Sequence, residues 1–93
     1  MIVRWTPEAR QDRSDIWDYL VALDPAAAMR MDAQFSVAVA RLADYPMLGH
    51  DGAVPGTREL TPHPSYPLVY EVDGDTVWIL TLVHAMRLWP PLR

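Results

Sequence analysis

The chain has 93 residues, a net charge of −4 and no cysteine, so it can form one core and excludes structural disulfides and thiolate metal sites. All eight basic residues are arginines, which argues against diffuse binding to a phosphate backbone and predicts no direct sequence-specific nucleic-acid binding. No apolar run approaches the roughly 20 residues of a membrane span, and no signal peptide stands out. We therefore expect a cytoplasmic single domain over 1–93 without a membrane partner.

The N-terminal segment predicts a short strand at residues 2–5 followed at once by a helix. Thr6, Pro7 and Glu8 supply a capping hydroxyl, a proline at the first helical position and an acid at the positive end of the helix dipole. Apolar residues then recur at helical spacing, and acidic residues occupy the other side, which we expect to be exposed. The apolar stripe is Ala9, Ile16, Leu20 and Leu23, flanked by Trp17 and Val21, and the polar side is Gln11, Asp12, Asp15 and Asp18.

A second helix is predicted to begin almost without a loop, because Asp24 and Pro25 repeat the start signal. Two helices joined this tightly form an antiparallel hairpin. The pair Tyr45 and Pro46 ends the second helix. Its apolar stripe is Met31, Phe35, Ala38, Val39 and Leu42, preceded by Ala28.

Three strands are predicted in the second half of the chain. Residues 47–56 lack periodicity and indicate a surface connection, after which 57–61, 68–72 and 76–84 have strand character. Asp73 and Gly74 predict a hairpin turn between the last two. The expected fold class is α+β in the order βααβββ, with a helical hairpin packed on one face of a small, mainly antiparallel sheet.

The last predicted strand is apolar on both faces, although two helices can cover only one face of a small sheet. Val77, Ile79 and Val83 would point to one face, and Trp78, Leu80 and Leu82 to the other. Trp5, the 47–56 loop and the tail at 88–92 could fold over the second face, or a partner could dock there as a helix or an added strand. The predicted partner-binding residues are Trp17, Trp78, Leu80, Leu82 and Trp89.

Four polar side chains are candidates for a functional role: Arg58, Tyr70, His84 and Arg87. Arg58 and Glu59 could equally form a surface ion pair, and Tyr70 fits core packing with its hydroxyl bonded to the backbone. His84 at a strand end would be partly exposed and suited to acid or base chemistry. Arg87 could stabilise charge on a reacting phosphate or pair with a strand carboxylate. The three histidines lack the spacing of a metal triad, so we expect no metal and no cofactor.

The segments 56–60, 68–75 and 83–90, in this order behind two helices, resemble the RelE/ParE superfamily of toxins from type II toxin-antitoxin modules. The resemblance covers nearly the whole chain. It implies a toxin with growth-inhibiting and plasmid-stabilising roles, neutralised by a cognate antitoxin that covers it. Members of the RelE-like branch cleave messenger RNA on the ribosome, whereas members of the ParE-like branch poison DNA gyrase, so whether this chain is an enzyme depends on its branch.

Arg58, His84 and Arg87 are the expected catalytic set if the chain is a ribosome-dependent endoribonuclease, and for Arg58 the resemblance adds that the family commonly carries a basic residue at the corresponding position. RelE-like cleavage relies on several lysines and arginines, and this chain has no lysine and an acidic balance. Inhibition of DNA gyrase needs a protein-binding surface instead, so gyrase is favoured over the ribosome as the target. A third alternative is a non-toxic member that only binds its antitoxin.

Overall fold

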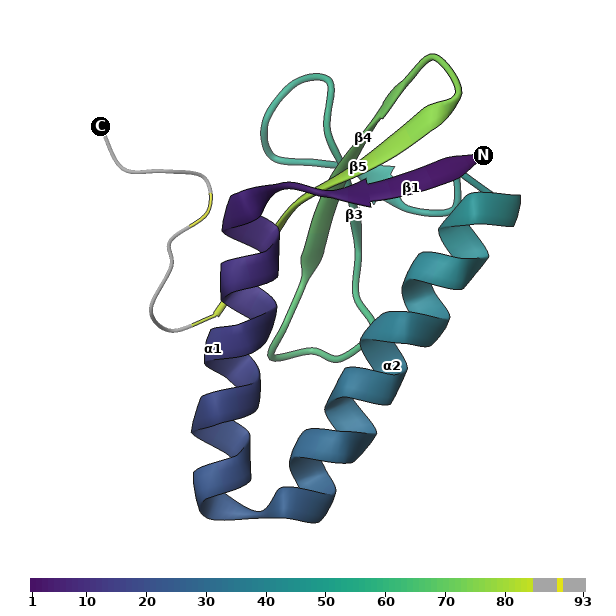
Figure 1. The fold of residues 1–93 in the computed structure, drawn as a ribbon. Coiled ribbons are helices and arrows are strands. Elements are labelled where there is room, and N and C mark those ends of the chain that lie inside the picture. The colour runs from purple at the N-terminus through teal and green to yellow at the C-terminus, as the bar shows by residue number, and fades with distance from the viewer. Residues whose placement is uncertain (85–88, 90–93) are drawn as a thin grey trace.

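A computed structural model describes residues 1–84 and Trp89. It confirms the predicted α+β fold, in which a helical hairpin lies against one face of a mixed sheet of five strands (Figure 1). The helices are α1 (Pro7–Leu23) and α2 (Pro25–Asp44). The strands are β1 (Ile2–Trp5), β2 (His50–Asp51), β3 (Arg58–Leu60), β4 (Leu68–Asp73) and β5 (Thr76–Leu82).

Both helices begin with the caps that the sequence predicted. The hydroxyl of Thr6 accepts a hydrogen bond from the Ala9 amide at 3.1 Å, and the carboxylate of Asp24 accepts one from the Ala26 amide at 3.0 Å. Asp24 is at once the last cap of α1 and the first cap of α2. A single residue therefore forms the turn, and the helices run antiparallel from it (Figure 1).

The sheet has the strand order β1-β5-β4-β3-β2. β1 pairs with β5 in parallel, and every other neighbouring pair is antiparallel. The predicted hairpin turn is present between β4 and β5, where Gly74 has a φ of 62°, which suits a residue without a side chain. The two-residue β2 lies inside the segment 47–56, which was predicted as an irregular connection. The sequence did not predict this strand, because so short a pairing leaves no alternating pattern.

The core lies between the helical hairpin and the sheet. Phe35 of α2 and Tyr66 of the β3–β4 connection meet edge to face, with ring centroids 6.1 Å apart. Burial, and secondarily the neighbouring Tyr19, raises the pKa of Tyr66. The buried cluster is Ala9, Ile16, Phe35, Leu42, Leu68, Tyr70, Val77, Ile79 and Leu82.

A β-bulge near the end of β5 changes which side chains face the core. Val69 is opposite Thr81, and Tyr70 is opposite Ile79, so Leu80 has no residue opposite it. One extra residue in a strand reverses the alternation beyond it. Leu82 consequently lies in the core at 0% exposure, and its predicted place on the partner-facing side was wrong.

The second face of the sheet is less apolar than the sequence predicted. Trp78 is half-buried and lies between Arg4 of β1 and Glu71 of β4, which are its two register partners. Both neighbours are charged, so the indole is bordered by polar side chains across the sheet. The apolar side chain predicted on this face of β5 is therefore present at Trp78, but its neighbours in the adjoining strands are charged.

Candidate functional site

The carboxylate of Asp12 joins α1 to the end of β5. Its Oδ2 accepts hydrogen bonds from the Thr81 hydroxyl at 2.6 Å and from the Leu82 amide at 3.1 Å. Its Oδ1 lies 3.2 Å from Nε2 of His84. Asp12 is 0% exposed, so these contacts are sheltered from water. A buried carboxylate with donors from three residues is a strong tertiary link.

The contacts of Asp12 bear on the predicted exposure of two residues, Asp12 and His84. Asp12 was expected on the exposed acidic side of the first helix, and it is buried instead. Helical spacing alone could not place it, because its donors come from a strand about 70 residues further along the chain. The His84 side chain is 7% exposed, so it is more enclosed than its position at a strand end suggested.

Asp12, Asp15 and His84 have potential ligand atoms within 4.8 Å of one another. We assign no metal to them, because both oxygens of Asp12 already face hydrogen-bond donors of the protein. The expected absence of a metal stays a prediction.

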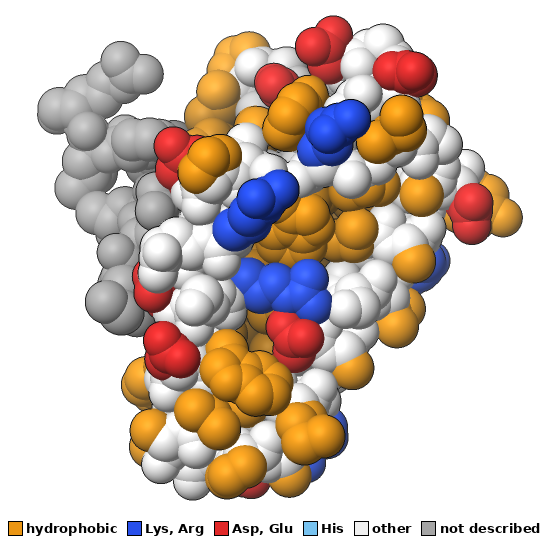
Figure 2. All heavy atoms as spheres, in the orientation of Figure 1, with side chains coloured by type: hydrophobic (Ala, Val, Ile, Leu, Met, Phe, Trp, Pro, Cys, Tyr) orange, Lys and Arg blue, Asp and Glu red, His pale blue; other side chains and the backbone are white. Residues whose placement is uncertain are grey.

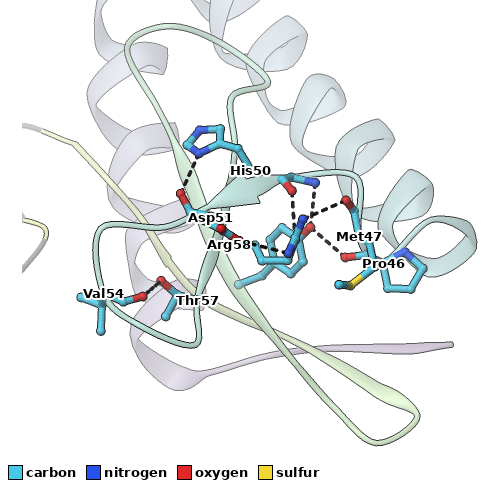
Figure 3. A network of polar contacts seen from close by, with 9 residues as sticks. Pro46, Met47, His50, Asp51, Val54, Thr57 and Arg58 are labelled. Carbon is cyan, nitrogen blue, oxygen red and sulfur yellow. Dashed lines mark hydrogen bonds and ion pairs between the residues drawn. The ribbon is translucent and has the colours of Figure 1, made fainter.

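Arg58 organises the loop that precedes β3. Its Nε donates to the Gly49 carbonyl at 2.9 Å, and its terminal nitrogens contact the Met47 carbonyl at 3.2 Å and the Asp51 carboxylate at 3.3 Å (Figure 3). Glu59 accepts from the Ala53 amide instead of pairing with Arg58. The guanidinium therefore points toward the loop at residues 47–51 and binds two of its backbone carbonyls.

Tyr70 confirms the expectation of core packing with a backbone-bonded hydroxyl. It is 0% exposed; its hydroxyl donates to the Pro46 carbonyl at 2.8 Å and accepts from the Gly49 amide at 2.8 Å. A Cβ added to Gly49 would lie 2.8 Å from the tyrosine ring and 2.6 Å from the Glu59 carbonyl, so only glycine allows this approach. Tyr70 and Arg58 together hold the segment between α2 and β3.

Replacing Arg58 with alanine is expected to lower the free energy of unfolding by about 1–2 kcal/mol, since two loop carbonyls lose a charged donor. Asp51→Ala removes only the ion pair, and its side chain is 95% exposed. That control is expected to change stability by less than about 0.5 kcal/mol. Urea unfolding of both variants measures the difference, and equal losses would mean that the ion pair, not the carbonyl contacts, is what matters.

The residues predicted for a nuclease are not seen to share a site. Arg58 is paired across the sheet with Tyr70, which in turn is opposite Ile79. His84 lies two residues after Leu82, the last residue of β5. Arg87 lies outside the described residues. The structure thus brings His84 to Asp12 and Arg58 to the 47–51 loop, and it does not bring the two to each other.

The predicted partner-binding residues do not form one surface either. Trp17 lies on α1 and is 37% exposed, whereas Trp78 extends from β5 on the face opposite to Val77 and Ile79. Leu80 is half-buried at the bulge, and Trp89 is half-buried. Apart from Leu82, their part in partner binding stays a prediction.

An open groove of about 530 Å³ lies where β1, α1 and α2 meet. Figure 2 shows hydrophobic side chains in a hollow of the helical face, bordered by basic and acidic side chains. Arg13 lies across it with its guanidinium carbon 5.0 Å from the centre of the Trp5 ring. The lining residues are Trp5, Arg10, Arg13, Ser14, Trp17 and Asp32.

Arg13 is fixed in this groove by contacts with α2. Its Nε donates to the Asp32 carboxylate at 2.6 Å, and one terminal nitrogen donates to the Ser36 hydroxyl at 2.8 Å. The groove was not predicted from the sequence, although the sequence contains a pattern that indicates it. Arg10, Arg13 and Ser14 precede Trp17 at helical spacing, so one face of α1 carries all four.

Among residues 1–84 and Trp89, neither helix combines the length and the hydropathy of a membrane-spanning segment.

The fold places the chain among small toxins with solved structures. It superimposes with a TM-score of 0.79 on a chain from the chromosomal ParDE toxin-antitoxin system of P. aeruginosa, with 27% identity over 90% of this chain and 95% of that one. The YoeB/ParE toxin from Agrobacterium tumefaciens gives a TM-score of 0.66 at 16% identity, over 90% and 98% of the two chains, and shows the shared fold alone.

Residues 3–89 match the family model described as the ParE toxin of the type II toxin-antitoxin system parDE. Two relatives are similar over almost their whole length. The Sinorhizobium fredii protein designated Y4kP is 39% identical over 95% of this chain and 92% of its own, and toxin RelE2 of Caulobacter vibrioides is 38% identical over 92% and 97%. This chain belongs to the ParE toxin family of the RelE/ParE superfamily, and it is the toxin of a type II toxin-antitoxin system. Such a toxin implies an antitoxin partner.

Proposed function

We propose that this toxin inhibits DNA gyrase and that its cognate antitoxin neutralises it. The observation that carries the proposal is the engagement of Arg58 and His84 in contacts within the protein. Growth inhibition in the cytoplasm, and plasmid stabilisation as its consequence, belong to the same proposal.

The surroundings of His84 argue against a role in cutting RNA. A general base must reach the proton it removes. Nε2 of His84 faces the buried Asp12, and the side chain is 7% exposed. The ring is therefore placed to link β5 to α1, which leaves little access for a ribose hydroxyl.

Arg58 and the charge of the chain support the same conclusion. The Arg58 guanidinium contacts two carbonyls and a carboxylate of its own loop, so its contacts within the protein compete with any contact to a phosphate. Docking on ribosomal RNA also needs clustered positive charge. The chain has a net charge of −4 and no lysine. A target recognised through protein surfaces suits these properties better than RNA does.

Induction of the chain in cells without the antitoxin tests the target. We expect growth arrest, a DNA-damage response and loss of negative supercoiling in a reporter plasmid, with transcripts remaining at full length. Co-expression of the antitoxin should restore all three. Transcripts cut on the ribosome, with cutting lost in His84→Ala or Arg87→Ala, would establish the nuclease alternative, and unaffected growth would establish a non-toxic member.

A further inference from the structure

We propose that the exposed side of α2 pairs with the same side of a second copy of this chain, in an antiparallel dimer with its two-fold axis beside Val37. The inference goes beyond the proposed function and does not depend on which target the toxin attacks. It rests on an exposed apolar strip along α2 and on two charges of opposite sign, one toward each end of that strip.

The exposed side of α2 has an apolar centre. Val37 lies on its middle turns and is 61% exposed, and Met29, two turns earlier, is 65% exposed. Ala33 and Ala40 precede and follow Val37 by one turn, so they share its side of the helix, and both are exposed. Their small side chains let a second helix approach to the usual interaxial distance of roughly 8–10 Å. A helix therefore fits this strip.

Two charged residues lie on the same side of α2, one on either side of Val37. Arg30 comes two turns before Val37 and Asp44 two turns after it, and both are exposed. Across residues 1–84 and Trp89, neither side chain forms a hydrogen bond or an ion pair within the chain. Asp44 is also the last residue of α2, where the helix dipole disfavours a negative charge. Both charges are therefore available to a partner.

The positions of these charges favour an antiparallel copy of the same helix. In a two-fold symmetric pair, a residue that precedes the axis on one helix faces the residue that follows it equally far on the other. Arg30 of each copy then faces Asp44 of the other, and the symmetry forms two ion pairs at once. Parallel helices would instead place Arg30 against Arg30 and Asp44 against Asp44, which is repulsive. The surface is thus complementary to itself in one orientation.

The proposed dimer leaves the groove at β1, α1 and α2 uncovered. Asp32 and Ser36 are the α2 residues that bind Arg13 at that groove. Around the helix they point at least about 100° away from Val37. A contact through one helix of 20 residues is smaller than the roughly 800 Å² per partner of a standard interface. We therefore expect association in the micromolar range.

Sedimentation equilibrium of the full chain, from low to high micromolar concentration, tests the inference. One chain has a mass of 10.6 kDa, and the weight-average mass is expected to rise toward twice that value. Val37→Glu places two like charges beside the axis and is expected to weaken association by at least about tenfold. Because Val37 is 61% exposed, the variant should keep the circular dichroism spectrum of the parent.

A charge swap tests the pairing itself. Arg30→Asp and Asp44→Arg are each expected to weaken association by about tenfold, because each replaces two attractive contacts by two repulsive ones. The double variant restores complementary charges and is expected to associate within about threefold of the parent. Arg10→Asp is the matched control, since Arg10 is an exposed arginine of α1 and the charge change is the same. It is expected to alter association less than about twofold.

Four results would contradict the dimer. A chain that keeps a mass of 10.6 kDa at every concentration would overturn it. Association unchanged by Val37→Glu would place the contact on another surface. A double variant no better than Arg30→Asp alone would overturn the antiparallel pairing, and equal weakening by Arg10→Asp and Arg30→Asp would reduce it to a general effect of net charge. None of these results changes the prediction for gyrase.

Discussion

The variant Asp12→Ala is expected to lose about 3–5 kcal/mol of unfolding free energy. Its carboxylate is 0% exposed and faces the Thr81 hydroxyl, the Leu82 amide and the His84 ring. Truncation leaves these donors buried without their acceptor, which costs far more than the loss of an exposed hydrogen bond. Urea unfolding followed by circular dichroism gives the difference in free energy.

Two further variants make this result specific. Asp18→Ala removes an exposed carboxylate from the same helix, and it is expected to change stability by less than about 0.5 kcal/mol. Asp12→Asn should lie between the two, because an amide oxygen can still accept from Thr81 and Leu82. If Asp12→Ala proved no more destabilising than Asp18→Ala, the link between α1 and β5 would not hold the fold together.

Tyr70→Ala is expected to lower the free energy of unfolding by about 3–5 kcal/mol, since it removes an aromatic ring from the centre of the core. Tyr70→Phe keeps the ring and removes only the hydroxyl, which bonds the Pro46 carbonyl and the Gly49 amide. We expect Tyr70→Phe to lower the free energy of unfolding by about 1–3 kcal/mol, because the Pro46 carbonyl and the Gly49 amide lose their hydrogen-bond partner. Thermal or urea unfolding of the two variants separates ring packing from loop anchoring.

Limited proteolysis provides the second measurement on Tyr70. The hydroxyl ties the start of the 46–57 segment to β4, so Tyr70→Phe should speed cleavage within that segment. Cleavage in the α1–α2 turn serves as the internal control and should keep its rate. A Tyr70→Phe protein as stable and as resistant as the parent would show that Arg58 alone anchors the loop.

The helical hairpin was predictable because its signals are local. Thr6 and Asp24 cap the helices within three residues of themselves, and the apolar stripes follow the helical period. Tyr70 was predictable for a similar reason, since an aromatic residue inside an alternating strand usually packs in the core and its hydroxyl needs a partner.

The features that were not predictable depend on contacts between distant parts of the chain. Asp12 has the pattern of an exposed helical residue, and only the end of β5 makes its burial favourable. Leu82 follows the strand alternation in the sequence, and the bulge opposite Val69 and Tyr70 reverses it. Nothing near Leu80 in the sequence, such as a glycine, marks that irregularity.

The candidate site shows the same division. Trp17 was predicted as a partner-binding residue, but Trp5 and Asp32, which line the groove with it, come from β1 and α2 and could not be assigned from one helix. Arg58 and His84 stood out by residue type and position in the strands. Their partners, the Gly49 carbonyl and Asp12, are structural, and that changes how both residues are interpreted.

The supercoiling activity of purified DNA gyrase in the presence of this chain tests the account most directly. We predict that the chain inhibits supercoiling in a dose-dependent manner and that prior addition of the antitoxin abolishes the inhibition. Full gyrase activity at every toxin concentration, together with cleavage of messenger RNA on purified ribosomes, would contradict it.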